Sequence, residues 1–182
     1  MAAAALAKHL LVGRVVAGVH RRLSAYGALL WASQLLVEST IVNYGNILVG
    51  TWALNALYSA FGASIGKLSV IRNKTPAIGI PDMLTLGERI VCGDTTKIVT
   101  SMALGSQEVL VAPVIIENMG TIGAWAVIMP GVTVGQQATL APLTIAEAGS
   151  DMKPRTVYMG AQAQPVKVNL TLALLPQEER DS

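Results

Sequence analysis

An apolar residue recurs at every sixth position through the middle of the chain. The series begins at Leu86, runs without a slip to Leu140, and has Ile80 one further step upstream. Its ten members are Leu86, Cys92, Ile98, Leu104, Leu110, Ile116, Ile122, Ile128, Val134 and Leu140. A spacing of six does not fit a helical face, which repeats about every 3.6 residues. The pattern therefore predicts short extended segments joined by turns.

Six-residue repeats are typical of a parallel β-helix, in which each step forms one face of a triangular prism. The apolar residue points inward and stacks on its equivalents in neighbouring coils, because one coil cannot bury its inner face alone. Glycine follows it at Gly87, Gly93, Gly105, Gly123 and Gly135, where a side chain would crowd the turn or φ must be positive. We predict an all-β solenoid, a parallel β-helix of about four coils, over residues 61–168. A helical segment over 1–60 precedes it and a tail over 169–182 follows.

The first sixty residues have a different composition from the repeats. No acidic residue precedes Glu38, and no charged residue lies between positions 39 and 66. Two apolar stretches, 23–37 and 41–65, therefore predict one or two hydrophobic helices. The second stretch has the about 20 residues that a membrane span needs, but its asparagines favour contact with the membrane interface. A helical cap packed on the end of the solenoid is the alternative.

Residues 1–23 are alanine-rich and basic, which is typical of an N-terminal targeting peptide or of a basic segment beside a membrane. The formal net charge of the whole chain is only +2, so nucleic acid is not an expected partner. The one cysteine, Cys92, excludes an intramolecular disulfide. Cys92 belongs to the apolar series, so we expect a buried side chain without a chemical role.

The residues 122–135, Ile-Gly-Ala-Trp-Ala-Val-Ile-Met-Pro-Gly-Val-Thr-Val-Gly, resemble the hexapeptide-repeat transferase superfamily. The stretches 50–58, 61–66, 140–144 and 152–154 resemble, more narrowly, the membrane-associated C-terminal domains of poly-lysine-synthetase-like nonribosomal peptide synthetases. The resemblance covers about residues 25–168. It implies a left-handed solenoid, commonly a homo-oligomer (a trimer), and transfer of acyl or aminoacyl groups from thioesters. The implied donors are coenzyme A or a phosphopantetheine-bound substrate, and the implied partners are carrier protein or synthetase domains.

The chain departs from this superfamily in its histidines. Many hexapeptide acyltransferases use a histidine of the solenoid as general base, and the narrower group tends to carry one near the position of residues 99–102. Here the two histidines, His9 and His20, both lie in the N-terminal basic segment. The three-histidine zinc site of the carbonic-anhydrase branch lacks its ligands, so no metal is expected.

Without a solenoid histidine, a general base would have to be a carboxylate. The candidates are Asp94 and Glu117, both expected at exposed corners, and Glu108. Glu108 falls at an inward-leaning position, where burial would strengthen it as a base; a distorted coil that exposes it is the alternative. The candidates for binding the phosphate groups of a coenzyme A-type donor are Lys153, Arg155 and Lys167. The alternative is that these cations lie on the surface and only keep the protein soluble.

Three classes of function remain open from the sequence. The resemblance favours an acyl or aminoacyl transferase that is a fragment, a stand-alone relative or a partner of a synthetase. The missing histidine favours a membrane-associated scaffold without catalytic activity. A carbonic-anhydrase-like protein that has lost its metal is the third class. Trp125 falls at a coil corner, where a bulky ring predicts a contact between chains or domains.

Overall fold

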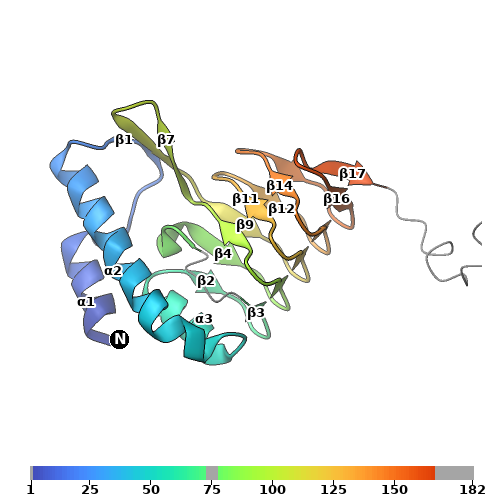
Figure 1. Cartoon of the computed structure of the whole chain (residues 1–182), viewed down its shortest axis with the longest axis horizontal. Coiled ribbons are helices and arrows are strands. Elements are labelled where there is room, and N and C mark those ends of the chain that lie inside the picture. The colour runs from blue at the N-terminus through green and yellow to red at the C-terminus, as the bar shows by residue number, and fades with distance from the viewer. Residues whose placement is uncertain (1, 73–77, 167–182) are drawn as a thin grey trace, which may run out of the picture.

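The computed structural model describes residues 2–72 and 78–166. Helices at the N-terminus cover one end of a stack of parallel strands, and the chain then winds away from them coil by coil (Figure 1). The N-terminal elements are α1 (Ala2–Leu11), β1 (Gly18–Arg21), α2 (Ala25–Leu48) and α3 (Trp52–Ala60). The prediction of hydrophobic helices in the first sixty residues is confirmed, except that residues 18–21 form a strand.

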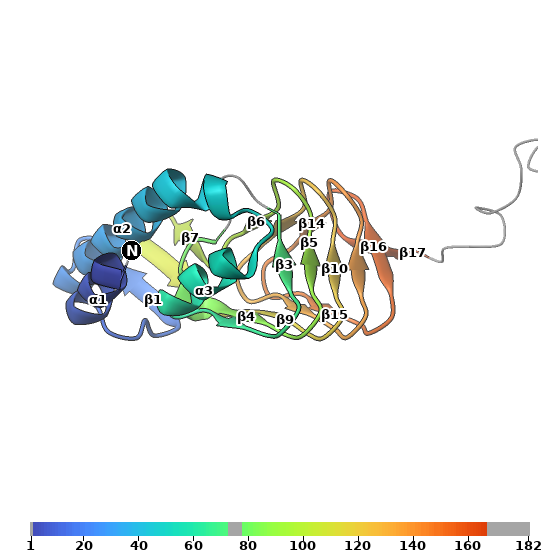
Figure 2. The ribbon, with the colours of Figure 1, turned by 90° about the horizontal axis from the view of Figure 1, so that it is seen from below.

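The repeats form three sheets of parallel strands, which the chain visits in turn (Figure 2). The first sheet contains β2 (Ser64–Ile65), β4 (Leu84–Leu86), β9 (Val114–Ile116), β12 (Thr133–Val134) and β15 (Asp151–Met152). The second contains β3 (Val70–Ile71), β5 (Val91–Cys92), β10 (Thr121–Ile122), β13 (Thr139–Leu140) and β16 (Val157–Met159), with β17 (Gln164–Val166) antiparallel at its edge. The third contains β6 (Lys97–Ile98), β11 (Val127–Ile128) and β14 (Ile145–Ala146). A short 3₁₀ turn, Pro81–Met83, precedes β4.

The apolar series forms columns inside this stack. Leu86 pairs with Ile116, and Val134 pairs with both Ile116 and Met152, so equivalent side chains lie directly above one another. All four are at most 3% exposed, which is the burial that the six-residue pattern predicts. The series continues past Leu140. Its further buried members are Ala146, Met152 and Tyr158.

Two members of the series are not in the core, and this part of the prediction is wrong. Residues 101–111 leave the solenoid as a β-hairpin of β7 (Ser101–Leu104) and β8 (Glu108–Val111). Leu104 is exposed and Leu110 is half-buried. Ile98 and Ile116, which follow each other along the coil, are eighteen residues apart instead of six, so the hairpin adds two whole steps. An insertion of that length preserves the spacing, so periodicity could not reveal it.

Ile80 was also expected in the series, but its place is taken by a neighbour. Ile78 forms the bridge to Ile98 in the third sheet, and Ile80 packs in a second cluster with Val15, Leu30 and Val111. This second cluster joins the N-terminal segment, α2 and the hairpin. The hairpin therefore packs against α2 and the N-terminal segment, with Ile80 completing the cluster.

Four of the five repeat glycines, Gly87, Gly93, Gly123 and Gly135, are needed because neighbouring coils approach closely, whereas Gly105 lies at the turn of the hairpin with a φ of 66° and open space around its Cβ position. A Cβ on Gly123 would lie 2.4 Å from the backbone nitrogen of Pro142 in the next coil. The positive φ of this turn falls two residues later, at Trp125 (φ 61°). Of the two reasons that the sequence left open, crowding is therefore the one that applies at Gly123.

The helices pack on the open end of the solenoid. In α3 the side chains of Leu54, Leu57 and Tyr58 are buried in the same core cluster as the first coil strands, together with Phe61. α1 is fixed by an ion pair between Lys8 and Asp82, whose side chains are only 1% and 3% exposed. The N-terminal segment is thus an integral part of the folded unit.

Candidate functional site

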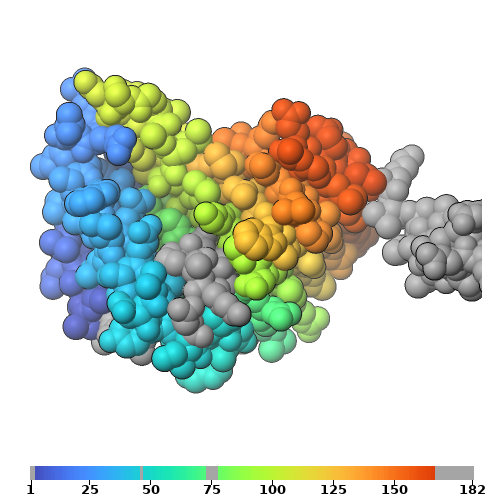
Figure 3. All heavy atoms as spheres, viewed as in Figure 1, coloured from blue at the N-terminus to red at the C-terminus, as the bar shows by residue number. Residues whose placement is uncertain are grey.

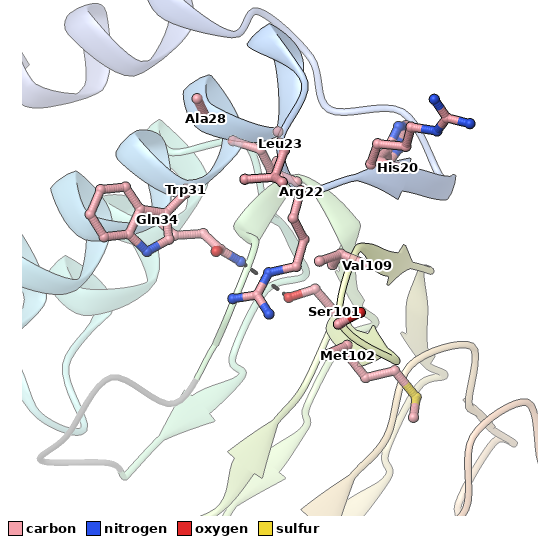
Figure 4. Close-up of a pocket in the computed structure, with 14 residues that line it drawn as sticks. His20, Arg22, Leu23, Ala28, Trp31, Gln34, Ser101, Met102 and Val109 are labelled. Atoms are coloured by element: carbon pink, nitrogen blue, oxygen red, sulfur yellow. Dashed lines mark hydrogen bonds between the residues drawn. The ribbon is translucent and has the colours of Figure 1, made fainter.

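A cavity of about 580 Å³ lies between the first half of α2 and the hairpin that projects from the solenoid. Its wall residues come from the end of β1, from α2 and from β7 and β8 (Figure 4). Small-molecule sites usually measure about 300–1,000 Å³, so this cavity has the size of a ligand site. In the space-filling view, the hairpin stands out from the upper end of the helical lobe (Figure 3).

One wall of the cavity is a three-stranded antiparallel sheet in the order β1-β8-β7. His20 lies opposite Val109, and Val109 lies opposite Ala103. Residues opposite one another across antiparallel strands point to the same face, so these three share a face with Ser101, which is two residues from Ala103. That face is turned toward α2, because Val109 and Val111 pack with Leu30 of the helix.

The other wall is α2, which starts directly after β1. Ser24 caps the helix, since its Oγ accepts a hydrogen bond from the backbone N–H of Gly27 at 3.0 Å. A Cβ on Gly27 would lie 2.4 Å from the carbonyl oxygen of Arg21, so glycine is what allows the helix to begin against the strand. Trp31 and Gln34 then follow on the side of the helix that lines the cavity.

A hydrogen bond crosses the cavity wall between the two elements. The amide Nε2 of Gln34 donates to the hydroxyl of Ser101 at 3.1 Å. In Figure 4 the side chain of Arg22 extends from the end of β1 toward this bond. Within residues 2–72 and 78–166, Lys8–Asp82 is the only ion pair, so the guanidinium of Arg22 has no carboxylate within 4.0 Å.

His20 is half-buried in the cavity wall and is held in place from two sides. Its Nε2 lies 2.8 Å from the carbonyl oxygen of Val16, and its ring lies against Tyr26 with centroids 4.9 Å apart. A carbonyl oxygen can only accept, so this bond requires the proton on Nε2. The Nδ1 atom of the neutral ring is then left as an acceptor. An oriented histidine with one free acceptor nitrogen is the usual arrangement of a general base.

The sequence analysis missed this site. His20 was placed in a helical basic segment, far from any coil, whereas β1 pairs with the hairpin and brings His20 beside Val109. The available signal was three β-branched residues within five positions, Val15, Val16 and Val19, which favour a strand. The sequence could not show that the strand pairs with residues about 90 positions away.

The three carboxylates proposed as bases lie in three separate places, and none lines the cavity. Glu108 is exposed on β8, opposite Arg21, so the exposed alternative holds and the inward position is wrong. Asp94 is exposed at a corner, where its carbonyl oxygen accepts from the N–H of Trp125. Glu117 is exposed at another corner, and its Oε2 accepts from the N–H of Gln136 at 2.8 Å. In the described part of the chain, no cluster of metal-ligating side chains occurs.

The proposed phosphate-binding cations lie in the last coils of the solenoid, at the end opposite to α2. Lys153 and Arg155 are both exposed, and Arg155 donates from Nε to the side-chain oxygen of Gln137 at 3.1 Å. Lys167 lies outside the described residues, as does the tail over 169–182. Lys153 and Arg155 remain a prediction about donor binding.

Cys92 is buried in the second sheet, as the apolar series predicts. Burial raises the pKa of its thiol to about 12. Since the thiolate is the reactive form of cysteine, Cys92 is a packing residue and not a nucleophile at neutral pH.

The length and composition of one helix meet the requirement for crossing a membrane. Among the described residues this is Ala25–Gly45, and 28% of its most apolar window is buried against the rest of the protein. Core helices of soluble proteins and signal sequences meet the same requirement, so this feature alone does not place the chain in a membrane.

Comparison with known proteins shows the fold. No protein-family model matches the sequence, and no curated protein sequence matches it. The structure resembles a hexapeptide-repeat-containing acetyltransferase from Vibrio cholerae, with 18% identity and a TM-score of 0.59 over 80% of this chain and 93% of that one. It resembles a maltose O-acetyltransferase from Clostridium difficile, with 13% identity and a TM-score of 0.60 over 88% of this chain and 95% of that one.

A third similar structure is a galactoside acetyltransferase in complex with coenzyme A, with 15% identity and a TM-score of 0.57 over 76% of this chain and 81% of that one. The Vibrio cholerae protein has also been crystallised with acetyl coenzyme A. The chain therefore shares the fold of these solved acetyltransferases, one of which is described as containing hexapeptide repeats.

Proposed function

We propose that this protein is an acyltransferase that moves an acyl group from a coenzyme A-type thioester to a small acceptor bound in the cavity between α2 and the hairpin. The fold likeness to acetyltransferases supports the reaction class. A fold hosts many functions, so the site must carry the argument. The observation that carries it is His20, which lines the cavity and has Nε2 fixed on the Val16 carbonyl.

In this reaction His20 is the general base. Its Nδ1 takes the proton of the acceptor hydroxyl or amine as that atom bonds to the thioester carbonyl carbon. The carbon–sulfur bond then breaks, and the imidazolium returns the proton to the leaving thiolate. The hydrogen bond to Val16 and the ring contact with Tyr26 keep the imidazole in one orientation.

The test compares the two histidines of the chain. His9 also bonds through Nε2 to a backbone carbonyl, that of Ala60 at 3.0 Å, but it does not line the cavity. Coenzyme A release from acetyl coenzyme A is measured with a set of hydroxyl and amine acceptors, using a thiol reagent. We expect His20→Gln to lower the turnover rate about 100-fold or more, and His9→Gln to leave it unchanged, because a general base contributes about 10² to 10⁴.

Two results would contradict this assignment. Equal activity of the native chain and His20→Gln would remove His20 as the base and return attention to Glu108, Glu117 and Asp94. Absence of turnover with every acceptor, in protein shown to be folded by circular dichroism, would contradict the acyltransferase function itself.

The donor is the finer part of the proposal. Exposed cations at Lys153 and Arg155 supply charge for the phosphates of coenzyme A or of a phosphopantetheine arm. The resemblance to nonribosomal peptide synthetase domains predicts an aminoacyl donor linked to a carrier protein. Mass spectrometry of a loaded carrier protein incubated with this protein tests that donor. Loss of the aminoacyl group from the carrier, beyond that in a control without this protein, supports such a partner.

We include a homo-oligomer, specifically a trimer, in the proposal. Trp125 and Leu143 lie at equivalent corners of successive coils and are 62% and 70% exposed, and the nearby outward side chain of Ile145 is 37% exposed. Large apolar side chains gathered on one side of a solenoid are typical of contact surfaces. Sedimentation of the native chain and of Trp125→Glu tests this. We expect the native mass to be three times that of the variant. Equal masses would contradict the oligomer, and a native mass of two or four subunits would contradict the trimer.

A second candidate function, a membrane-associated scaffold, is favoured by the outward face of α2. Leu35 and Val42 lie within about 20° of one another on a helical wheel, next to the stripe of the helix that contains the cavity-lining Trp31, and are 44% and 53% exposed. An exposed apolar helix face is typical of proteins that lie in a membrane interface. Flotation with anionic phospholipid vesicles tests it, and Leu35→Glu with Val42→Glu should abolish binding. Vesicle binding without acyl transfer would favour the scaffold.

A further inference from the structure

We propose that the acceptor in this cavity is an aromatic or similarly planar carboxylic acid, and that Arg22 binds its carboxylate while Trp31 contacts its planar body. This inference names the substrate class of the acyltransferase site and so rests on the proposed function. It is carried by the charges and the apolar surfaces that line one cavity.

The first observation is an excess of positive charge in the cavity wall. Arg21 and Arg22 line it, and no lining residue is acidic. Described acidic residues near this region are Glu108 on β8 and Glu38, one turn of α2 beyond Gln34, and neither is within 4.0 Å of an arginine nitrogen. The guanidinium donors of Arg22 thus have no partner among the described residues, and a ligand anion in the cavity would supply one.

The second observation is the surrounding polarity. The wall that faces Arg22 contains the Gln34–Ser101 hydrogen bond, which supplies neutral polar groups beside the cation (Figure 4). The first turn of α2, with its partial positive charge, lies in the same wall through Gly27 and Ala28. An anion is stabilised by both, whereas a cationic acceptor would be repelled.

The third observation is the apolar part of the lining. Leu23, Leu30, Trp31 and Val109 all line the cavity, and the Trp31 ring lies along α2 on the helical wall. A flat indole surface packs well against a planar ring. The fork of a guanidinium matches the two oxygens of a carboxylate, which makes arginine the usual choice for planar acids. Together these surfaces fit an acid with an apolar, planar body.

The experiment measures binding in the absence of a donor, so that it does not depend on catalysis. The probes are benzoate, 4-hydroxybenzoate and phenylacetate, each paired with its neutral amide, and phenyl phosphate as a second anion. They are titrated calorimetrically into the full chain and into Arg22→Gln. The matched control is Arg14→Gln, which removes an exposed cation of the same segment that does not line the cavity.

We expect at least one acid to bind the native chain tenfold or more tightly than its amide. Arg22→Gln should bring that ratio close to one, and Arg14→Gln should leave it unchanged. The proposal is overturned if no acid is preferred over its amide, if the preference survives in Arg22→Gln, or if phenyl phosphate binds more tightly than the carboxylates. Trp31→Ala should weaken the acid and its amide alike, and unchanged binding would remove the contact with the planar body.

The outcome also separates this inference from the function on which it rests. Preferential binding of 4-hydroxybenzoate, which carries an acceptor hydroxyl, without acylation of it or of any other hydroxyl or amine acceptor would leave the carboxylate site in place and contradict the acyltransferase. Acylation of neutral acceptors alone, dependent on His20, would support the acyltransferase and overturn the carboxylate assignment.

Discussion

The buried ion pair between Lys8 and Asp82 provides the sharpest test of how the N-terminal segment is attached. The side chains are 1% and 3% exposed, and one carboxylate oxygen, Oδ1 of Asp82, has no described hydrogen-bond partner. Replacing Lys8 with Met keeps most of the apolar packing of the lysine stem. It leaves the carboxylate buried without its one counter-ion.

We expect Lys8→Met to lower the free energy of unfolding by about 3–5 kcal/mol, the usual cost of removing one partner from a buried pair. This is a large part of the about 5–15 kcal/mol that stabilises a typical domain. Adding Asp82→Asn to Lys8→Met should recover part of the loss, because an unpaired amide costs about 1–3 kcal/mol and a buried unpaired charge costs more. Arg14→Met, at an exposed position, should change stability by less than about 0.5 kcal/mol.

Urea unfolding followed by circular dichroism measures all four proteins. A loss below about 1 kcal/mol in Lys8→Met would show that the pair is hydrated in solution and does not hold α1 in place. A double variant less stable than Lys8→Met would refute the reasoning that the unpaired charge is the source of the loss.

Three further predictions concern the core and the corners. Cys92, whose thiol pKa is raised to about 12 by burial, should not react with iodoacetamide at pH 8.5 in the native protein, and should react fully in 8 M urea; native labelling would show that the second sheet opens. Gly123→Ala should destabilise the protein by about 2 kcal/mol or more, because the added Cβ would lie 2.4 Å from the backbone of the next coil. Unchanged stability in urea unfolding would show that the coils can separate. Glu117→Ala, which removes the cap on the Gln136 N–H at an exposed corner, should cost only about 0.5–1 kcal/mol by the same measurement, and a larger loss would show a role beyond this hydrogen bond.

Much of the solenoid could be predicted from the sequence because its information is local. Each step places one apolar side chain inward, and parallel stacking brings together residues whose separation is a multiple of six, such as Ile116, Val134 and Met152. The same logic failed at Leu104 and Leu110, since an inserted hairpin of two whole steps keeps the register and contains leucines at the expected positions. In the sequence, residues 101–111 look like two further faces of the prism. The structure shows that they form a hairpin, because their two strands pair with each other in antiparallel orientation.

The cavity between α2 and the hairpin could not be predicted, because it is formed by contacts between distant segments that no local sequence pattern encodes. The sequence determined the repeat, the apolar helices, the basic start and the absence of a solenoid histidine, because each is a matter of composition or spacing. The tertiary structure decided that β1 joins the hairpin, that α2 covers the same sheet, and that His20, Arg22, Gln34 and Ser101 therefore line one cavity. The physical reason is that strand pairing is set by backbone hydrogen bonds and burial of facing side chains, so partners about 90 residues apart are chosen only when the chain folds.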